Sequence, residues 1–97
     1  MELEDLAFRA VDKWGVDMQL IVLIEEMSEL TKTITKFIRY GDIEAIYEEY
    51  ADVLIMMKQL EVIMIDMDEN FIEKFETKIV EKMRRLAEKL DVESVAD

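Results

Sequence analysis

The 97-residue sequence contains no cysteine, no histidine and no proline, and only two glycines. Without cysteine or histidine it has no disulfide, no thiolate or imidazole metal ligand and no histidine general base. Any bound metal must therefore be held by oxygen, which favours Mg²⁺, Mn²⁺ or Ca²⁺. Because helix-breaking residues are scarce and 52% of the residues are hydrophobic, we expect an all-α fold.

Positive charge is also scarce. The 12 lysines and arginines are outnumbered by 24 acidic residues, which gives a net charge of −12. Such a chain lacks the positive surface that binds phosphate backbones, so we expect no nucleic-acid partner. No apolar run reaches the roughly 20 residues that span a bilayer, so we expect no membrane insertion. Because Met1 leads directly into Glu2 and Glu4 without a signal-peptide pattern, we expect a cytoplasmic protein.

Hydrophobic periodicity and the two glycines predict four helices in a single domain over residues 1–97, with a charged tail at about 91–97. The helices are expected at about Leu3 to Lys13, Met18 to Tyr40, Asp42 (as cap) to Ile65, and Glu69 to Leu90. The very short connection at Gly41 predicts that the second and third helices form an antiparallel hairpin. The expected architecture is an antiparallel four-helix bundle.

The third predicted helix is apolar on several sides. One set of residues is expected to fill the core of one subunit: Ile46, Val53, Met57, Leu60 and Met64. A second set is expected to point in other directions: Ile55, Met56, Val62, Ile63 and Ile65. The polar residues are expected to share one arc: Glu48, Glu49, Asp52 and Gln59. Such a helix needs more cover than one small chain provides, so we expect a homodimer or homotetramer.

Two carboxylate pairs, Glu26 with Glu29 and Glu49 with Asp52, lie on the second and third predicted helices. Residues at i and i+3 lie one above the other, so each pair can direct two oxygens to one point. An antiparallel hairpin brings the pairs together, and four close carboxylates favour a divalent cation. Mg²⁺ is the best candidate because it combines carboxylates with waters and substrate phosphate, and Mn²⁺ is an alternative.

The alternative is that these acids belong to ordinary solvated helix faces. Among 24 acidic residues, pairs at this spacing occur by chance. Asp52 and Gln59 favour the metal site, because they interrupt a strongly apolar run in which a buried carboxylate must be paired or bind metal.

The same residues carry a resemblance to a known family. The pattern consists of Trp14-Gly15, Gln19, Glu25-Glu26-Met27-Ser28-Glu29-Leu30, a spacer, Glu49-Tyr50-Ala51-Asp52-Val53-Leu54-Ile55 and Gln59-Leu60. It resembles the MazG-like nucleoside triphosphate pyrophosphohydrolases, whose signature is E-x-x-E followed by E-x-x-D. The likeness covers most of the chain.

The resemblance implies an oligomeric all-α enzyme that cleaves a nucleoside or deoxynucleoside triphosphate to the monophosphate and pyrophosphate, for example in cleansing the nucleotide pool. It assigns the Mg²⁺ ligands to Glu26, Glu29, Glu49 and Asp52. Glu25 would either hydrogen-bond to the metal ligands without contacting the metal or help to activate a water molecule. A related branch of the same superfamily hydrolyses phosphoribosyl-ATP with the same kind of site.

Relatives in the family hold phosphate with basic residues of the last helix. Lys78, Lys82 and Arg85 resemble that segment and share one helix face. The alternative is that they form surface ion pairs. Many relatives also have an Asn close to this Lys, whereas the only Asn here is Asn70.

Trp14 and Gln19 are candidates for binding the base by stacking and hydrogen bonding. For Trp14, however, core packing is the reading that we prefer. The competing function is a non-catalytic helical module that oligomerises and binds a protein partner.

Overall fold

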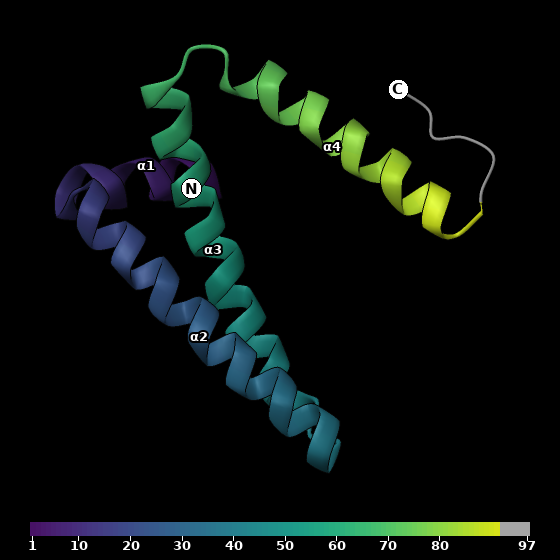
Figure 1. Ribbon diagram of the computed structural model, residues 1–97. Helices are drawn as coiled ribbons and strands as arrows, with labels where there is room; N and C mark the ends of the chain where they lie inside the picture. The colour runs from purple at the N-terminus through teal and green to yellow at the C-terminus, as the bar shows by residue number, and fades with distance from the viewer. Residues whose placement is uncertain (92–97) are drawn as a thin grey trace. The chain divides into compact units, whose positions relative to one another are not determined.

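The computed structural model describes residues 1–91, and over that range the chain forms four helices and no strand. The helices are α1 (Leu3–Trp14), α2 (Val16–Tyr40), α3 (Glu44–Met67) and α4 (Phe71–Lys89) (Figure 1). The expected all-α class is therefore confirmed. None of these helices is long and apolar enough to cross a membrane. Most of the charged tail expected at 91–97 lies outside the described residues.

The chain divides after Met64 into two compact units. The first contains α1, α2 and most of α3, and in it α2 and α3 lie side by side as an antiparallel hairpin (Figure 1). The second begins at Ile65 and contains α4. The expected hairpin is present in the first unit.

Both glycines stand at helix ends with positive φ angles, 90° for Gly15 and 74° for Gly41. Each donates its N–H to the carbonyl four residues earlier, that of Val11 or Phe37, over 2.8 Å. Glycine adopts these angles without the steric cost that a side chain would bring. The predicted helix ends at these two positions are confirmed.

The predicted helix starts need small corrections. Helix α2 begins at Val16 rather than Met18, because the turn between the helices is made by Gly15 alone, and Asp17 lies inside the first turn of α2. At α3 the carboxylate of Asp42 accepts a hydrogen bond from the N–H of Glu44 over 3.2 Å. That contact is the one expected of a residue at the start of a helix.

The buried face of α3 differs from the expected one. Val53 is buried as expected, but Met57 is 45% exposed, whereas Met56 and Ile63 are buried. Gln59, expected in the polar arc, is also buried. Residues 52, 56, 59 and 63 follow the spacing of one helix face, and this face is the inner one. The expectation was right for Val53, Ile55 and Ile65 and wrong for four residues: Met56, Met57, Gln59 and Ile63. It failed there because an almost uniformly apolar helix gives no clear indication of which side packs.

In the second unit, a turn at Asp68 precedes α4 and delays its start from the expected Glu69 to Phe71. Asp68 accepts a hydrogen bond from the N–H of Asn70 over 2.9 Å and pairs with the Lys74 ammonium over 2.8 Å. The bond from Lys74, followed by that from Asn70, holds the pKa of Asp68 below its ordinary value. On α4 the rings of Phe71 and Phe75 stack with centroids 5.7 Å apart.

Candidate metal centre

Three carboxylates meet between α2 and α3. Glu26 on α2 and Glu49 and Asp52 on α3 each place one oxygen so that all three oxygens lie within 4.8 Å of one another. All three residues are partly buried. Three carboxylates that approach this closely are a donor set of the kind that Mg²⁺ or Mn²⁺ uses, with waters or phosphate completing the shell. The donor set therefore fits such an ion.

The two helices position these groups in different ways. Glu49 and Asp52 share a face of α3 at the i,i+3 spacing. Glu26 reaches them from the antiparallel α2, where Leu23 one turn earlier is buried. On α3, Val53 beside Asp52 is also buried. The cluster thus stands at the edge of the hairpin core, where apolar packing fixes the backbone and solvent still reaches the carboxylates.

The cluster is electrostatically unfavourable without a cation. Desolvation raises the pKa of Glu26, and so, in decreasing order, do the charges of Asp52 and Glu49, a hydrogen bond from protonated Glu26 to Asp52 and the charge of Glu29. Desolvation also raises the pKa of Glu49, followed by the charges of Asp52, Glu29 and Glu48. Among residues 1–64, which form the first unit, no lysine or arginine forms an ion pair with a cluster member.

The fourth expected ligand, Glu29, is not part of the cluster. Its carboxylate lies 3.5 Å from the ammonium of Lys32, and its side chain is half exposed. Its charge nevertheless raises the pKa of both Glu26 and Glu49. Glu29 therefore lies near enough to act on the cluster while its oxygens point to Lys32. Glu25 is exposed on α2 and is also outside the cluster.

The residues expected to bind substrate lie in two places. On α1, Trp14 is 57% exposed, with the Lys13 ammonium 5.4 Å from its ring centroid, so the expectation of core packing for Trp14 is wrong. Its position at the end of α1, directly before the reversal at Gly15, leaves it at the surface of the chain. Gln19 on α2 is buried.

On α4 in the second unit, Lys78, Lys82 and Arg85 are all exposed. Lys78 pairs with Glu81 over 3.3 Å, which matches the surface-pair alternative for that residue.

Gln59 has a feature that the sequence reasoning did not assign. It is only 6% exposed, and its carbonyl oxygen Oε1 has no hydrogen-bond partner. In the sequence, the burial of Gln59 is indicated only by its position two helical turns after Asp52 within an apolar run.

Comparison of the chain with protein-family models, with curated proteins and with solved structures gave no match.

We expect millimolar Mg²⁺ or Mn²⁺ to raise the melting temperature. Binding to the folded state alone stabilises it, and the cation also removes repulsion among the three carboxylates. Asp52→Asn should abolish most of that gain, because Asp52 acts on both Glu26 and Glu49. Thermal denaturation followed by circular dichroism measures the effect. An unchanged melting curve for the wild type across this range would count against the metal centre.

The stability of the metal-free protein should depend on pH through the same groups. Raised pKa values mean that the folded state holds protons on Glu26 and Glu49 more tightly than the unfolded chain does. This contribution to the free energy of unfolding therefore grows as pH falls from neutral through the raised pKa values. In Glu26→Gln the dependence should be shallower, and at neutral pH the metal-free variant should be more stable than the wild type.

The matched control for the pH series is Glu25→Gln, which removes the same charge from the adjacent, exposed position. It should follow the wild-type curve. Parallel pH profiles for wild type and Glu26→Gln would show that the three carboxylates do not interact.

Proposed function

We propose that the chain is a Mg²⁺-dependent nucleoside triphosphate pyrophosphohydrolase of the MazG-like type, acting as a homodimer or homotetramer. The observation that carries the proposal is the meeting of Glu26, Glu49 and Asp52 across two helices, with no basic partner among residues 1–64 of the first unit. The residue resemblance and the oxygen-only donor set support it.

The chain's own residues have distinct roles in this proposal. Glu26, Glu49 and Asp52 hold the cation, and Glu29 completes the set after its carboxylate leaves Lys32. When bound, the cation neutralises charge on the phosphates and on the departing pyrophosphate. Glu25 is placed next to the ligands in sequence, where it can accept a hydrogen bond from a water.

The reaction needs no protein nucleophile. A water oxygen forms a bond to the α-phosphorus while the bond from that phosphorus to the α,β-bridging oxygen breaks in line. The water gives up a proton to a carboxylate or to solvent, the bridging oxygen leaves with pyrophosphate, and the nucleoside monophosphate remains. We propose that Lys82 and Arg85, with Lys78, bind the phosphate chain, so that Lys82→Ala mainly raises KM.

The test is a screen of ribonucleoside and deoxynucleoside triphosphates with Mg²⁺, in which pyrophosphate and orthophosphate are measured separately. Pyrophosphate together with the monophosphate is the expected result. Phosphoribosyl-ATP belongs in the panel, because its exclusive hydrolysis would indicate the related branch of the superfamily. Absence of pyrophosphate from every substrate would refute the enzyme proposal and leave the non-catalytic helical module.

A further inference from the structure

Helix α4 carries two exposed stripes along its length. An apolar stripe follows one face at helical spacing, and its members are between 43% and 57% exposed: Ile72, Phe75, Ile79, Met83 and Leu86. A basic stripe runs along one flank of it, also in steps of three and four residues: Lys74, Lys78, Lys82, Arg85 and Lys89. Amphipathic helices in proteins are stabilised mainly by packing of their apolar face, so we expect another surface to cover this one.

The charge of α4 differs from that of the other three helices. It contains six lysines and arginines and four glutamates, whereas acidic residues outnumber basic ones in α1, α2 and α3. Of the basic stripe, only Lys74 and Lys78 form ion pairs with the described residues 65–91 of the second unit. The rest of the stripe suits an acidic partner surface.

A second copy of the chain can provide that partner surface. Each copy has a net charge of −12, so two copies repel one another unless positive charge lies where they meet. Helix α4 is the element that can supply this positive charge. A contact between α4 of one copy and an acidic, apolar surface of the other replaces repulsion with attraction and covers apolar side chains on both.

The α2 and α3 hairpin has such a surface at its carboxylate cluster. Glu26, Glu49 and Asp52 direct one oxygen each to within 4.8 Å of one another, with no basic partner among residues 1–64. Met27, directly after Glu26, is 48% exposed, and Tyr50, between Glu49 and Asp52 in the sequence, is 58% exposed. Apolar side chains therefore adjoin negative charge on the hairpin, as they adjoin positive charge on α4.

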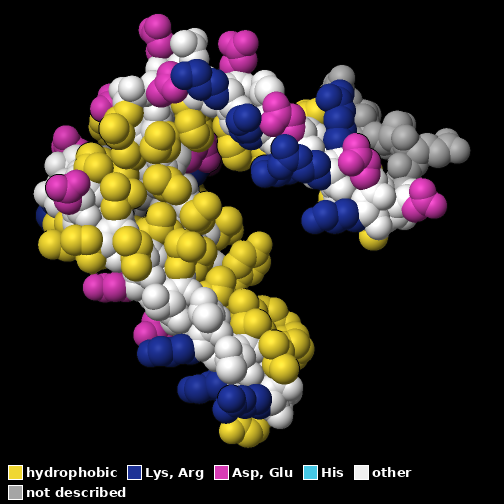
Figure 2. Space-filling view, in the orientation of Figure 1, with side chains coloured by type: hydrophobic (Ala, Val, Ile, Leu, Met, Phe, Trp, Pro, Cys, Tyr) yellow, Lys and Arg dark blue, Asp and Glu magenta, His cyan; other side chains and the backbone are white. Residues whose placement is uncertain are grey.

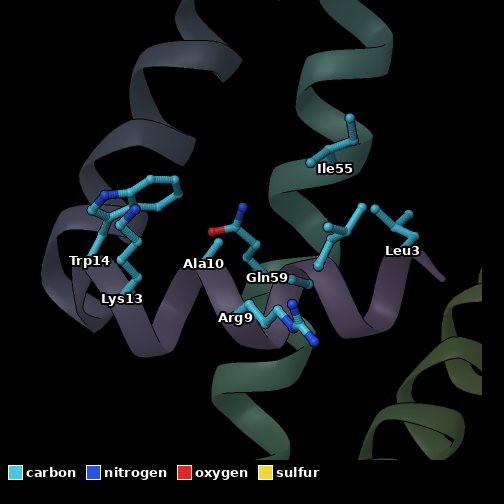
Figure 3. Close-up of a pocket in the computed structure, with 9 residues that line it drawn as sticks. Leu3, Arg9, Ala10, Lys13, Trp14, Ile55 and Gln59 are labelled. Atoms are coloured by element: carbon cyan, nitrogen blue, oxygen red, sulfur yellow. The ribbon is translucent and has the colours of Figure 1, made fainter. Parts of the chain in front are cut away.

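A second apolar surface of the first unit suits α4 less well. It is a cavity of about 330 Å³ between α1 and α3, lined in part by Trp14, Ile55 and Gln59 (Figure 3). Arg9 and Lys13 also line it, and neither forms an ion pair among residues 1–64. Their positive charge opposes the approach of the basic stripe, so the hairpin is the favoured surface.

We propose that α4 of one copy docks on the α2 and α3 hairpin of a second copy. Its apolar stripe lies against Met27 and Tyr50, and its basic stripe lies beside the carboxylate cluster. This contact builds on the association of copies in the proposed function and identifies the surfaces that meet. It requires neither nucleotide nor metal.

The absence of cysteine from the sequence allows a direct test by cross-linking. Lys82→Cys places a thiol where the two stripes of α4 adjoin, and Met27→Cys places one beside the carboxylate cluster. The two full-length variants are co-expressed and treated with a short bismaleimide. We expect a covalent dimer of twice 11.5 kDa on a denaturing gel. Peptide mass spectrometry of that band should identify a link between positions 27 and 82.

The matched control is Tyr40→Cys, co-expressed with Lys82→Cys. Tyr40 is also exposed on α2, but it lies roughly 20 Å along the helix from Met27. We expect no link between positions 40 and 82. A single chain that carries both Lys82→Cys and Met27→Cys distinguishes the two possible origins of a link, because a contact between copies gives dimers and a contact within one chain gives an internally linked monomer.

Ile79→Glu should weaken association at least about tenfold, because its charge would be buried in the contact without a partner. Thr77→Glu adds the same charge at an exposed position on the opposite face of α4 and should associate like the wild type. Light scattering over a dilution series measures both. The cross-links decide the question if Ile79→Glu fails to fold.

Four results would each overturn the proposed contact: no link between positions 27 and 82, an equal yield of links from Tyr40→Cys, only internally linked monomers from the doubly substituted chain, or unchanged association of Ile79→Glu. Pyrophosphate release without the link between copies would refute this contact alone. The link without pyrophosphate release would refute the proposed function alone.

Discussion

Asp52→Asn or Glu49→Gln is expected to lower pyrophosphate release by at least about a hundredfold. Each substitution preserves shape and removes one negative charge from a cluster whose oxygens lie within 4.8 Å of one another. The loss should be greatest at Asp52, whose charge acts on both other members. Steady-state assays with saturating nucleotide and a series of Mg²⁺ concentrations separate weaker metal binding from slower turnover.

The matched control for these variants is Glu48→Gln. It removes the same charge from the same helix, one residue from Glu49, at an exposed position outside the cluster. We expect close to wild-type turnover. Full activity in both Asp52→Asn and Glu49→Gln would exclude these carboxylates as the metal ligands.

The chain should form an oligomer in solution. Its hairpin leaves large apolar side chains exposed, among them Ile24 and Leu54 and, as expected from the sequence, Ile55. Figure 2 shows hydrophobic side chains covering much of one face of the first unit. Monomeric proteins rarely expose apolar surface of this extent. Light scattering should therefore give a mass that is a multiple of 11.5 kDa.

Leu54→Glu should shift that mass towards the monomer, because a charge would be buried without a partner in the interface. Thr31→Glu adds the same charge at an exposed polar position of α2 and should leave the mass unchanged. A monomeric wild type at micromolar concentration would sink the prediction. The apolar residues of α3 would then have to be covered within one chain.

The features that could be predicted are those that depend on local sequence. Gly15 and Gly41 locate two helix ends because few other residues accept their φ angles. The i,i+3 spacing of Glu49 and Asp52 determines that they share a face wherever α3 packs. The position of Glu26 opposite them follows once the hairpin is accepted. Three of the four expected ligands accordingly meet.

The features that could not be predicted depend on which of two nearby groups a side chain pairs with, or on contacts between residues far apart in the sequence. Glu29 can direct its carboxylate either to the cluster or to the ammonium of Lys32, which lies three residues later on the same helix. In the structure it pairs with Lys32. Which face of α3 is buried depends on how α1 and α2 dock, and this determines the burial of Gln59 and the existence of its cavity. Neither outcome can be read from periodicity in a helix that is apolar on several sides.

The short link between α2 and α3 also has a consequence for folding kinetics. Because residues 41–43 alone join the two helices, Glu26 meets Glu49 and Asp52 as soon as the hairpin closes, with a small loss of loop entropy. Carboxylate repulsion therefore opposes the closing of the hairpin itself, and not only the stability of the finished protein. A cation bound by these carboxylates would then favour closing of the hairpin as well as the stability of the finished protein.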